Sequence, residues 1–110
     1  MSDDVLLELA ATIKSRRRSD AEKSYTKQLL DAGPGRCSKK FGEEACETII
    51  AALSEDDEAL RGEAADVLYH LLVLLEARDI DVSDVLEVLR GRMGTSGVVE
   101  KASRSANKQS

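Results

Sequence analysis

Two pairs of acidic residues, each with its members three positions apart, constrain this chain more than any other feature. Glu44 and Glu47 form the first pair, and Glu63 and Asp66 form the second. Residues three apart on a helix share a face, so each pair predicts a helix that presents two carboxylates from one stripe. If the two helices face each other, four carboxylates meet in one small volume. Like charges that close destabilise a fold unless a cation neutralises them. Oxygen ligands suit a hard divalent ion, above all Mg²⁺, and we therefore predict a metal site.

The rest of the pattern predicts an all-α fold. Only 3% of the 110 residues are aromatic, and β-branched residues are few, which argues against a sheet. This length suits one small domain, which oligomerisation would help to stabilise. We expect helices over residues 3 or 4 to 17, 24–32, 38–53, 55–78 and 83–92, in a bundle of four to five helices. Residues 1–97 are expected to form the domain, and residues 98–110 a flexible C-terminal tail.

The two central helices have different apolar patterns. In the helix over 38–53, apolar side chains cover about half the circumference. Cys46 falls on this apolar face and is expected in the core, whereas Ala51 is expected on the narrower arc that carries the acids. The second half of the helix over 55–78 is apolar nearly all round, which predicts burial on several sides. Ser54 is the expected N-cap of that helix.

Charge and cysteine content exclude several classes of protein. The formal net charge is −5, which argues against nucleic acid as a partner, because binding a phosphate backbone needs a basic surface. The run Arg16-Arg17-Arg18 is read as the solvated basic end of a helix. Cys37 and Cys46 form no CxxC motif, so neither a disulfide framework nor a thiolate zinc site is expected. No apolar run approaches membrane-spanning length and no signal peptide is recognisable, so we expect a cytoplasmic protein.

The acidic pairs indicate an anionic substrate. Mg²⁺ bridges carboxylates to phosphate oxygens, and such a centre can activate water and neutralise a leaving pyrophosphate. Basic residues close to the acids in sequence are candidate contacts for the outer phosphates: Lys39, Lys40, Arg36 and Arg61. The ordinary alternative is that the acids are solvated surface residues in weak ion pairs. Two pairs on neighbouring helices, one of them framed by leucines, favour the metal site over this alternative.

Other metal centres fail on ligand count. A di-iron carboxylate bundle needs Glu-x-x-His on two helices, and the zinc hydrolase motifs also need more histidines than this chain has. His70 is the single histidine, four positions after Asp66. A lone histidine on an apolar helix is more often structural than catalytic, and both roles stay open for it.

Several longer segments resemble one enzyme family. They are Ser24-Tyr25-Thr26, Lys39-Lys40-x-Gly42-Glu43-Glu44-Ala45, Glu63-Ala64-Ala65-Asp66 and Tyr69-His70-Leu71-Leu72. In these segments the chain resembles the phosphoribosyl-ATP pyrophosphatases, which belong to the all-α, MazG-like nucleoside triphosphate pyrophosphohydrolases. The resemblance implies Mg²⁺-dependent hydrolysis of phosphoribosyl-ATP to phosphoribosyl-AMP and pyrophosphate, the second step of histidine biosynthesis. Mn²⁺ is an expected substitute for Mg²⁺.

The resemblance also implies roles for individual residues. It makes Glu44, Glu47, Glu63 and Asp66 the metal ligands, with Glu44 and Glu47 also counted as catalytic. Glu43 would be a further ligand or the residue that orients water. Lys40 is the preferred phosphate contact, with Lys39 second. Ser24, Tyr25 and Thr26 would contact substrate or only pack their helix.

The resemblance further implies a homodimer whose helices complete each other's sites. Phosphoribosyl-AMP cyclohydrolase would be the pathway neighbour that takes the product. Two alternatives stay open. One is a housecleaning pyrophosphatase acting on a free nucleotide such as dCTP or dUTP. The other is a helical adaptor without catalysis, which would be indifferent to Mg²⁺.

Overall fold

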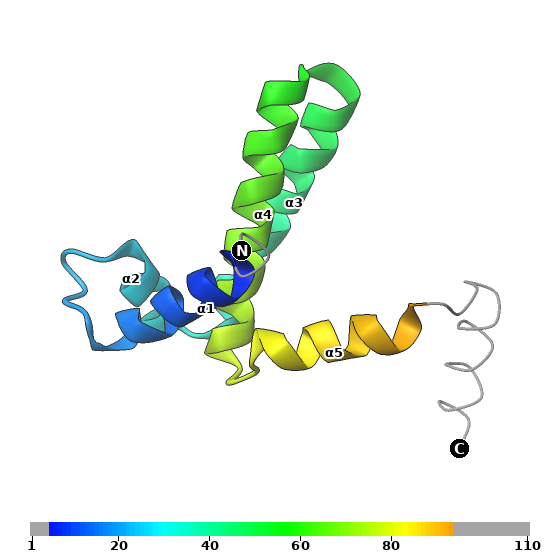
Figure 1. Ribbon diagram of the computed structural model, residues 1–110. Coiled ribbons are helices and arrows are strands. Elements are labelled where there is room, and N and C mark those ends of the chain that lie inside the picture. The colour runs from blue at the N-terminus through cyan, green and yellow to red at the C-terminus, as the bar shows by residue number, and fades with distance from the viewer. Residues whose placement is uncertain (1–4, 94–110) are drawn as a thin grey trace.

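The computed structural model describes residues 5–93, which fold into helices joined by short connections, with no strand in that range (Figure 1). The elements are α1 (Val5–Ser15), the 3₁₀-helix η2 (Arg16–Arg18), α2 (Tyr25–Ala32), α3 (Pro34–Ser54), α4 (Asp57–Ala77) and α5 (Val82–Arg92). The all-α prediction is therefore confirmed. The predicted tail, residues 98–110, lies outside the described residues.

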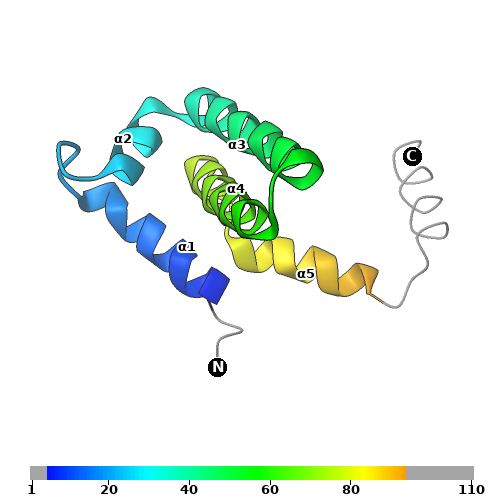
Figure 2. The ribbon, with the colours of Figure 1, turned by 90° about the horizontal axis from the view of Figure 1, so that it is seen from above.

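A hairpin of the two longest helices dominates the fold. α3 and α4 are each 21 residues long, and they contact each other more extensively than any other pair of elements. Figure 1 shows them side by side, joined by a short turn, with α1, α2 and α5 gathered around the opposite end of the hairpin. Viewed from above in Figure 2, α3 and α4 remain adjacent, and α1 and α2 lie along one side of them. The hairpin is the element that brings the two acidic pairs together.

The junction between α2 and α3 explains one wrong boundary. Gly33 has a φ of 95°, a conformation that glycine adopts without steric cost, and its N–H donates to the carbonyl of Leu29 at 3.2 Å. Pro34 then occupies the first turn of α3. Proline suits that position because its φ is already helical and its missing N–H would have no partner there. The sequence prediction started this helix at residue 38 and was therefore four residues late.

The turn between α3 and α4 corrects the predicted cap. Asp56, not Ser54, is the N-cap of α4, and its carboxylate accepts from the N–H of Ala59 at 2.9 Å. Ser54 instead ends α3 and donates its hydroxyl to the carbonyl of Ile50 at 2.8 Å. A carboxylate at the N-cap also interacts favourably with the helix dipole.

The core lies where the smaller helices meet the base of the hairpin. Its buried members are Ile13, Leu29, Cys37, Leu72, Val73 and Val82. Cys37, from the first turns of α3, is 1% exposed, and its thiol donates to the carbonyl of Leu29 at 3.3 Å. Cys46 is exposed, so the prediction that Cys46 belongs to the core is wrong. The predicted burial of the second half of α4 is confirmed by His70, Leu72 and Val73.

α3 turns acids of its narrower arc toward the acids of α4, as the prediction of facing stripes requires, and leaves much of its broad apolar face exposed. Ala51, placed by the sequence pattern on the acidic arc, is 1% exposed, whereas Ile49, Ile50 and Leu53 are 59%, 54% and 83% exposed. In the single chain, α4 packs on the arc of α3 that carries the acids, and the broad apolar face of α3 points outward. This arrangement buries Ala51, leaves Glu44 half-buried and Glu47 exposed, and exposes an apolar surface.

Candidate metal site

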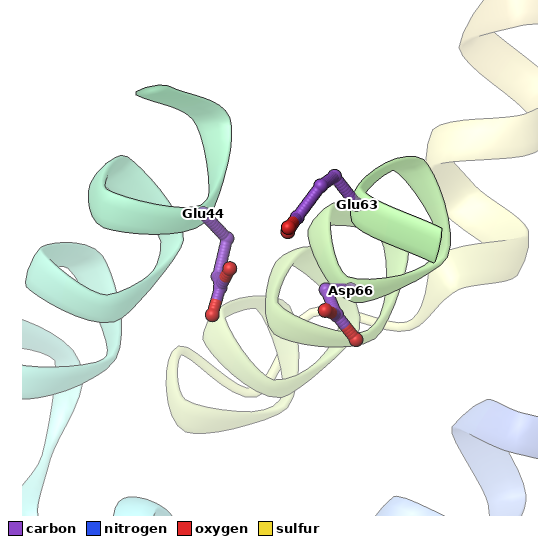
Figure 3. A group of neighbouring side chains, drawn as sticks. All are labelled: Glu44, Glu63 and Asp66. Atoms are coloured by element: carbon purple, nitrogen blue, oxygen red, sulfur yellow. The ribbon is translucent and has the colours of Figure 1, made fainter. Parts of the chain in front are cut away.

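The α3–α4 hairpin brings together three of the four predicted carboxylates. Glu44 from α3 and Glu63 and Asp66 from α4 each offer one carboxylate oxygen, and these oxygens all lie within 4.8 Å of one another. Figure 3 shows Glu44 reaching from α3 toward α4, with Glu63 extending toward it and Asp66 beside Glu63 on α4. A group of this kind could hold a metal ion, because oxygen ligands from two rigid helices converge on one point.

Glu47 lies beside this group and acts on it electrostatically. Burial raises the pKa of the Glu44 carboxyl, and the neighbouring Glu47 carboxylate raises it further. Burial likewise raises the pKa of Glu63, followed by repulsion from Glu47 and Asp66. Burial and the neighbouring carboxylates therefore disfavour the ionisation of Glu44 and Glu63. A cation bound among these carboxylates would instead favour their ionised forms and lower their pKa values.

Two oxygen atoms of this site have no partner. Within residues 5–93, Oε2 of Glu44 and Oε1 of Glu63 are buried and accept no hydrogen bond. A buried polar atom without a partner costs free energy, and most buried polar atoms in proteins are paired. The chemistry of the donor set and these unpaired oxygens fit a divalent cation.

Thr48 ties the backbones of the two acidic residues together. Its hydroxyl lies 2.9 Å from the carbonyl oxygen of Glu44, one turn earlier in α3, and 3.2 Å from the carbonyl oxygen of Glu63 in α4. One hydroxyl proton serves these two acceptors. Sequence reasoning assigned Thr48 no role. The spacing from Glu44 could have indicated the first bond, but the second depends on how α4 docks.

His70 packs directly against the acidic group. It is 6% exposed, and its Nε2 lies 4.0 Å from Oε1 of Glu44. The rings of Tyr69 and Tyr25 meet its imidazole edge-on, with centroids 4.9 Å and 6.2 Å away. Burial lowers the pKa of His70, and Lys40 lowers it further, so the imidazole is neutral at pH 7. A neutral ring at this point forms one wall of the site without adding charge to it.

Lys40 and Glu43 are paired with each other rather than grouped with the ligands. Nζ of Lys40 lies 3.2 Å from Oε1 of Glu43. The bond to Glu43 raises the pKa of Lys40, as do the nearby Tyr25 and, to a smaller extent, Glu44. The same bond lowers the pKa of Glu43. Lys40 therefore lies at the edge of the acidic group and stays protonated, because its pKa is raised. Lys39 is exposed.

The three predicted contacts on α2 have different surroundings. Ser24 caps α2, since its Oγ accepts from the N–H of Lys27 at 3.1 Å. Thr26 shares a hydrogen bond of 2.5 Å with the hydroxyl of Tyr69. Tyr25 is half exposed and faces His70. Ser24 and Thr26 therefore have structural bonds, and Tyr25 is the one that reaches toward the acids.

Together, the helical hairpin and its convergent carboxylates define an all-α protein with a candidate divalent-metal site. Residues 6–93 match the family model described as phosphoribosyl-ATP pyrophosphohydrolase. The chain belongs to this family of hydrolases, and the resemblance seen in the sequence is confirmed.

Relatives named phosphoribosyl-ATP pyrophosphatase match most of the chain. The protein from Cereibacter sphaeroides is 54% identical over 100 residues, which are 91% of this chain and 97% of that protein. The protein from Roseobacter denitrificans is 56% identical over 96 residues, 87% of this chain and 91% of that protein. The protein from Jannaschia sp. is 54% identical over 99 residues, 90% of this chain and 97% of that protein.

Among the described helices, none has the length and apolar character that crossing a membrane requires.

Proposed function

We propose that this chain hydrolyses phosphoribosyl-ATP to phosphoribosyl-AMP and pyrophosphate, the second step of histidine biosynthesis. Membership of the family and the names of its relatives support this substrate. The observation that carries the chemistry is the convergence of Glu44, Glu63 and Asp66, where two buried carboxylate oxygens have no partner among residues 5–93. A polyphosphate brought by a divalent cation is the ligand that such a site is best suited to accept.

We propose Mg²⁺ as the cation, with Mn²⁺ as a substitute. Glu44, Glu63 and Asp66 would hold it, and Glu47, whose charge acts on both glutamates, would be the fourth ligand. Carboxylate ligands alone favour a hard ion over zinc or copper. Bound Mg²⁺ would neutralise charge on the polyphosphate and lower the pKa of a coordinated water.

The residues around the acids would position the phosphates. Lys40 stands at the edge of the group with its charge maintained by Glu43, and would bind an outer phosphate. Lys39 would be a secondary contact on the exposed side. Glu43, held outside the close group by Lys40, would orient the attacking water rather than act as a ligand. His70, buried and neutral, would form one wall of the site beside Glu44.

A homodimer is the second part of the proposal. The hairpin exposes Ile49, Ile50 and Leu53 on α3 and Leu68 on α4, which is 45% exposed. Ile49, Ile50 and Leu53 are neighbours on one helix, and contiguous exposed apolar side chains typically mark an interaction site. A second copy covering this surface would add apolar burial to a domain whose own core is small. It would also place the partner's helices beside the acidic group.

The remaining parts of the proposal concern the extent of the domain, its cellular location and its partners. Residues 1–97 would act as one domain in the cytoplasm, and phosphoribosyl-AMP cyclohydrolase would take the product. Neither nucleic acid nor a membrane is needed as a partner.

Turnover of phosphoribosyl-ATP, measured beside dCTP and dUTP with Mg²⁺ added and removed, tests the substrate. We expect hydrolysis of phosphoribosyl-ATP that stops when the metal is chelated. Equal or faster hydrolysis of the free nucleotides would favour the housecleaning alternative.

Calorimetric titration of the wild type and Glu47→Gln with Mg²⁺ or Mn²⁺ tests whether the acidic group binds a divalent cation. The absence of a metal-dependent signal in the wild type, even with nucleotide present, would favour the adaptor.

A further inference from the structure

A polar cavity of about 500 Å³ lies apart from the acidic group, where η2 leads into α2. Figure 1 shows this part of the chain as the connection between α1 and α2, at the edge of the molecule. The residues around the cavity are polar or charged: Arg16, Ser19, Asp20, Lys23, Ser24, Tyr25 and Thr26. These residues can supply charges and hydrogen bonds to a small polar ligand.

Two cations of this cavity have no ion-pair partner within residues 5–93. Arg16 and Lys23 line the cavity without an acidic partner, whereas Arg17, between them in sequence, is held at the end of α4 by Glu76, with its Nε 2.5 Å from Oε2. Arg17 therefore connects the 3₁₀-helix η2 to the end of α4, in addition to being part of the basic helix end that the sequence predicted. The one acid of the cavity, Asp20, accepts from the N–H of Glu22 at 3.0 Å. The local charge thus favours an anion.

The start of α2 adds hydrogen-bond donors to these cations. Ser24 Oγ accepts from the N–H of Lys27, so its own hydroxyl proton is free to donate in another direction. Tyr25 and Thr26 form the first turn of α2, where backbone N–H groups have no partner inside the helix. A helix N-terminus favours a phosphate group. Cations and donors therefore converge on the same cavity.

Tyr25 connects this cavity to the acidic group. It lines the cavity, its ring meets His70, and Nε2 of His70 lies 4.0 Å from Oε1 of Glu44. A substrate with one anionic end at the acids could therefore place a second anionic end in the cavity.

On the basis of the proposed function, we propose that this cavity binds the phosphomonoester of the substrate's phosphoribosyl group. Arg16 and Lys23 pair with the phosphate, and Ser24 and the first turn of α2 donate to its oxygens. Phosphoribosyl-ATP differs from a free nucleoside triphosphate by this second anionic end. The cavity is then the determinant that selects phosphoribosyl-ATP over ATP and deoxynucleotides.

Kinetics of Arg16→Gln and Lys23→Gln test this assignment. The matched control is Arg18→Gln, which removes the same charge from the same 3₁₀-helix but from a residue outside the cavity lining. We expect the KM for phosphoribosyl-ATP to rise about tenfold in each cavity variant, as for the loss of one charge-assisted hydrogen bond, and to stay at the wild-type value in the control. ATP lacks the phosphomonoester, so its inhibition constant as a competitor should stay unchanged in all variants. An unchanged KM in both cavity variants, or an equal rise in the inhibition constant of ATP, would overturn the assignment.

A binding measurement separates this inference from the proposed function. Ribose 5-phosphate is titrated into the metal-free protein, because it carries the phosphomonoester without the triphosphate. We expect saturable binding in the wild type and Arg18→Gln, and its loss in Arg16→Gln and Lys23→Gln. The four proteins should have the same circular dichroism spectrum, which shows that each variant is folded. If the wild type binds ribose 5-phosphate in this way but does not hydrolyse phosphoribosyl-ATP, the function fails and the phosphate site stands. If the wild type hydrolyses the substrate but does not bind ribose 5-phosphate, the function stands and the inference fails.

Discussion

The Thr48 hydroxyl in α3 lies 3.2 Å from the carbonyl oxygen of Glu63 in α4, at the level where the acids of the two helices meet. Because the same hydroxyl also bonds the carbonyl of Glu44 at 2.9 Å, one side chain contacts the backbones of two proposed ligands. Residues that orient ligands in this indirect way affect metal affinity strongly.

Replacing Thr48 should therefore weaken metal binding more than it weakens the fold. Thr48→Val keeps the shape and removes the hydroxyl. We expect about a tenfold loss of Mg²⁺ or Mn²⁺ affinity by calorimetry. The free energy of unfolding should fall by about 1 kcal/mol. Thr48→Ser restores the hydroxyl and should recover most of the affinity. Wild-type affinity in Thr48→Val would show that the bridge has no influence on the site.

Removing one proposed ligand charge should separate stability from activity. Glu63→Gln relieves repulsion among the acids, so urea denaturation of the metal-free protein should show stability that is unchanged or slightly higher. Turnover should fall by more than about a hundredfold, since a ligand contributes more than an outer residue. A large loss of metal-free stability in Glu63→Gln would mean that Glu63 is structural.

The stability of the metal-free protein should depend on pH through the same acids. Glu44 and Glu63 have raised pKa values in the folded state, so they bind protons more tightly there than in the unfolded chain. Their ionisation therefore costs stability as the pH rises from about 4.3, the ordinary glutamate pKa, through the raised folded-state values. The measurement is urea denaturation of the wild type and Glu63→Gln at pH 4 to 8. The wild type should lose stability relative to the variant as pH rises, and Mg²⁺ should reduce this difference. A difference that does not change with pH would contradict the raised pKa values.

A charge on the exposed face of the hairpin should prevent dimerisation. Leu53 is 83% exposed in the single chain, and Leu53→Lys would place an ammonium in the proposed interface. We expect sedimentation to show a dimer for the wild type and a monomer for the variant. Val5→Lys is the matched control, since Val5 is 63% exposed but belongs to α1 and not to the hairpin. A monomeric wild type, or a dimeric Leu53→Lys, would count against this interface.

Much of the fold could be predicted from local signals. The spacing of Glu44 and Glu47, and of Glu63 and Asp66, predicted helices carrying acids on one stripe, and both helices are present. The Gly33-Pro34 pair marked the end of α2, because its conformational preferences act within a few residues. The start of α3 was misplaced because Pro34 was read as a break and not also as a helix start.

What each face of α3 meets was decided by tertiary packing. Periodicity defines a stripe on a helix, but it does not say which stripe a neighbouring helix covers. Ala51 proved buried and Cys46 exposed because α4 lies on the acidic arc, while Cys37 joined the core through its place beside α2. The reach of Thr48 to Glu63, and the place of Tyr25 between the polar cavity and His70, likewise depend on segments far apart in sequence. The sequence by itself determined the helices and the acids they carry. Only the docking of one helix on another determined which of those acids share a centre and what lies beside it.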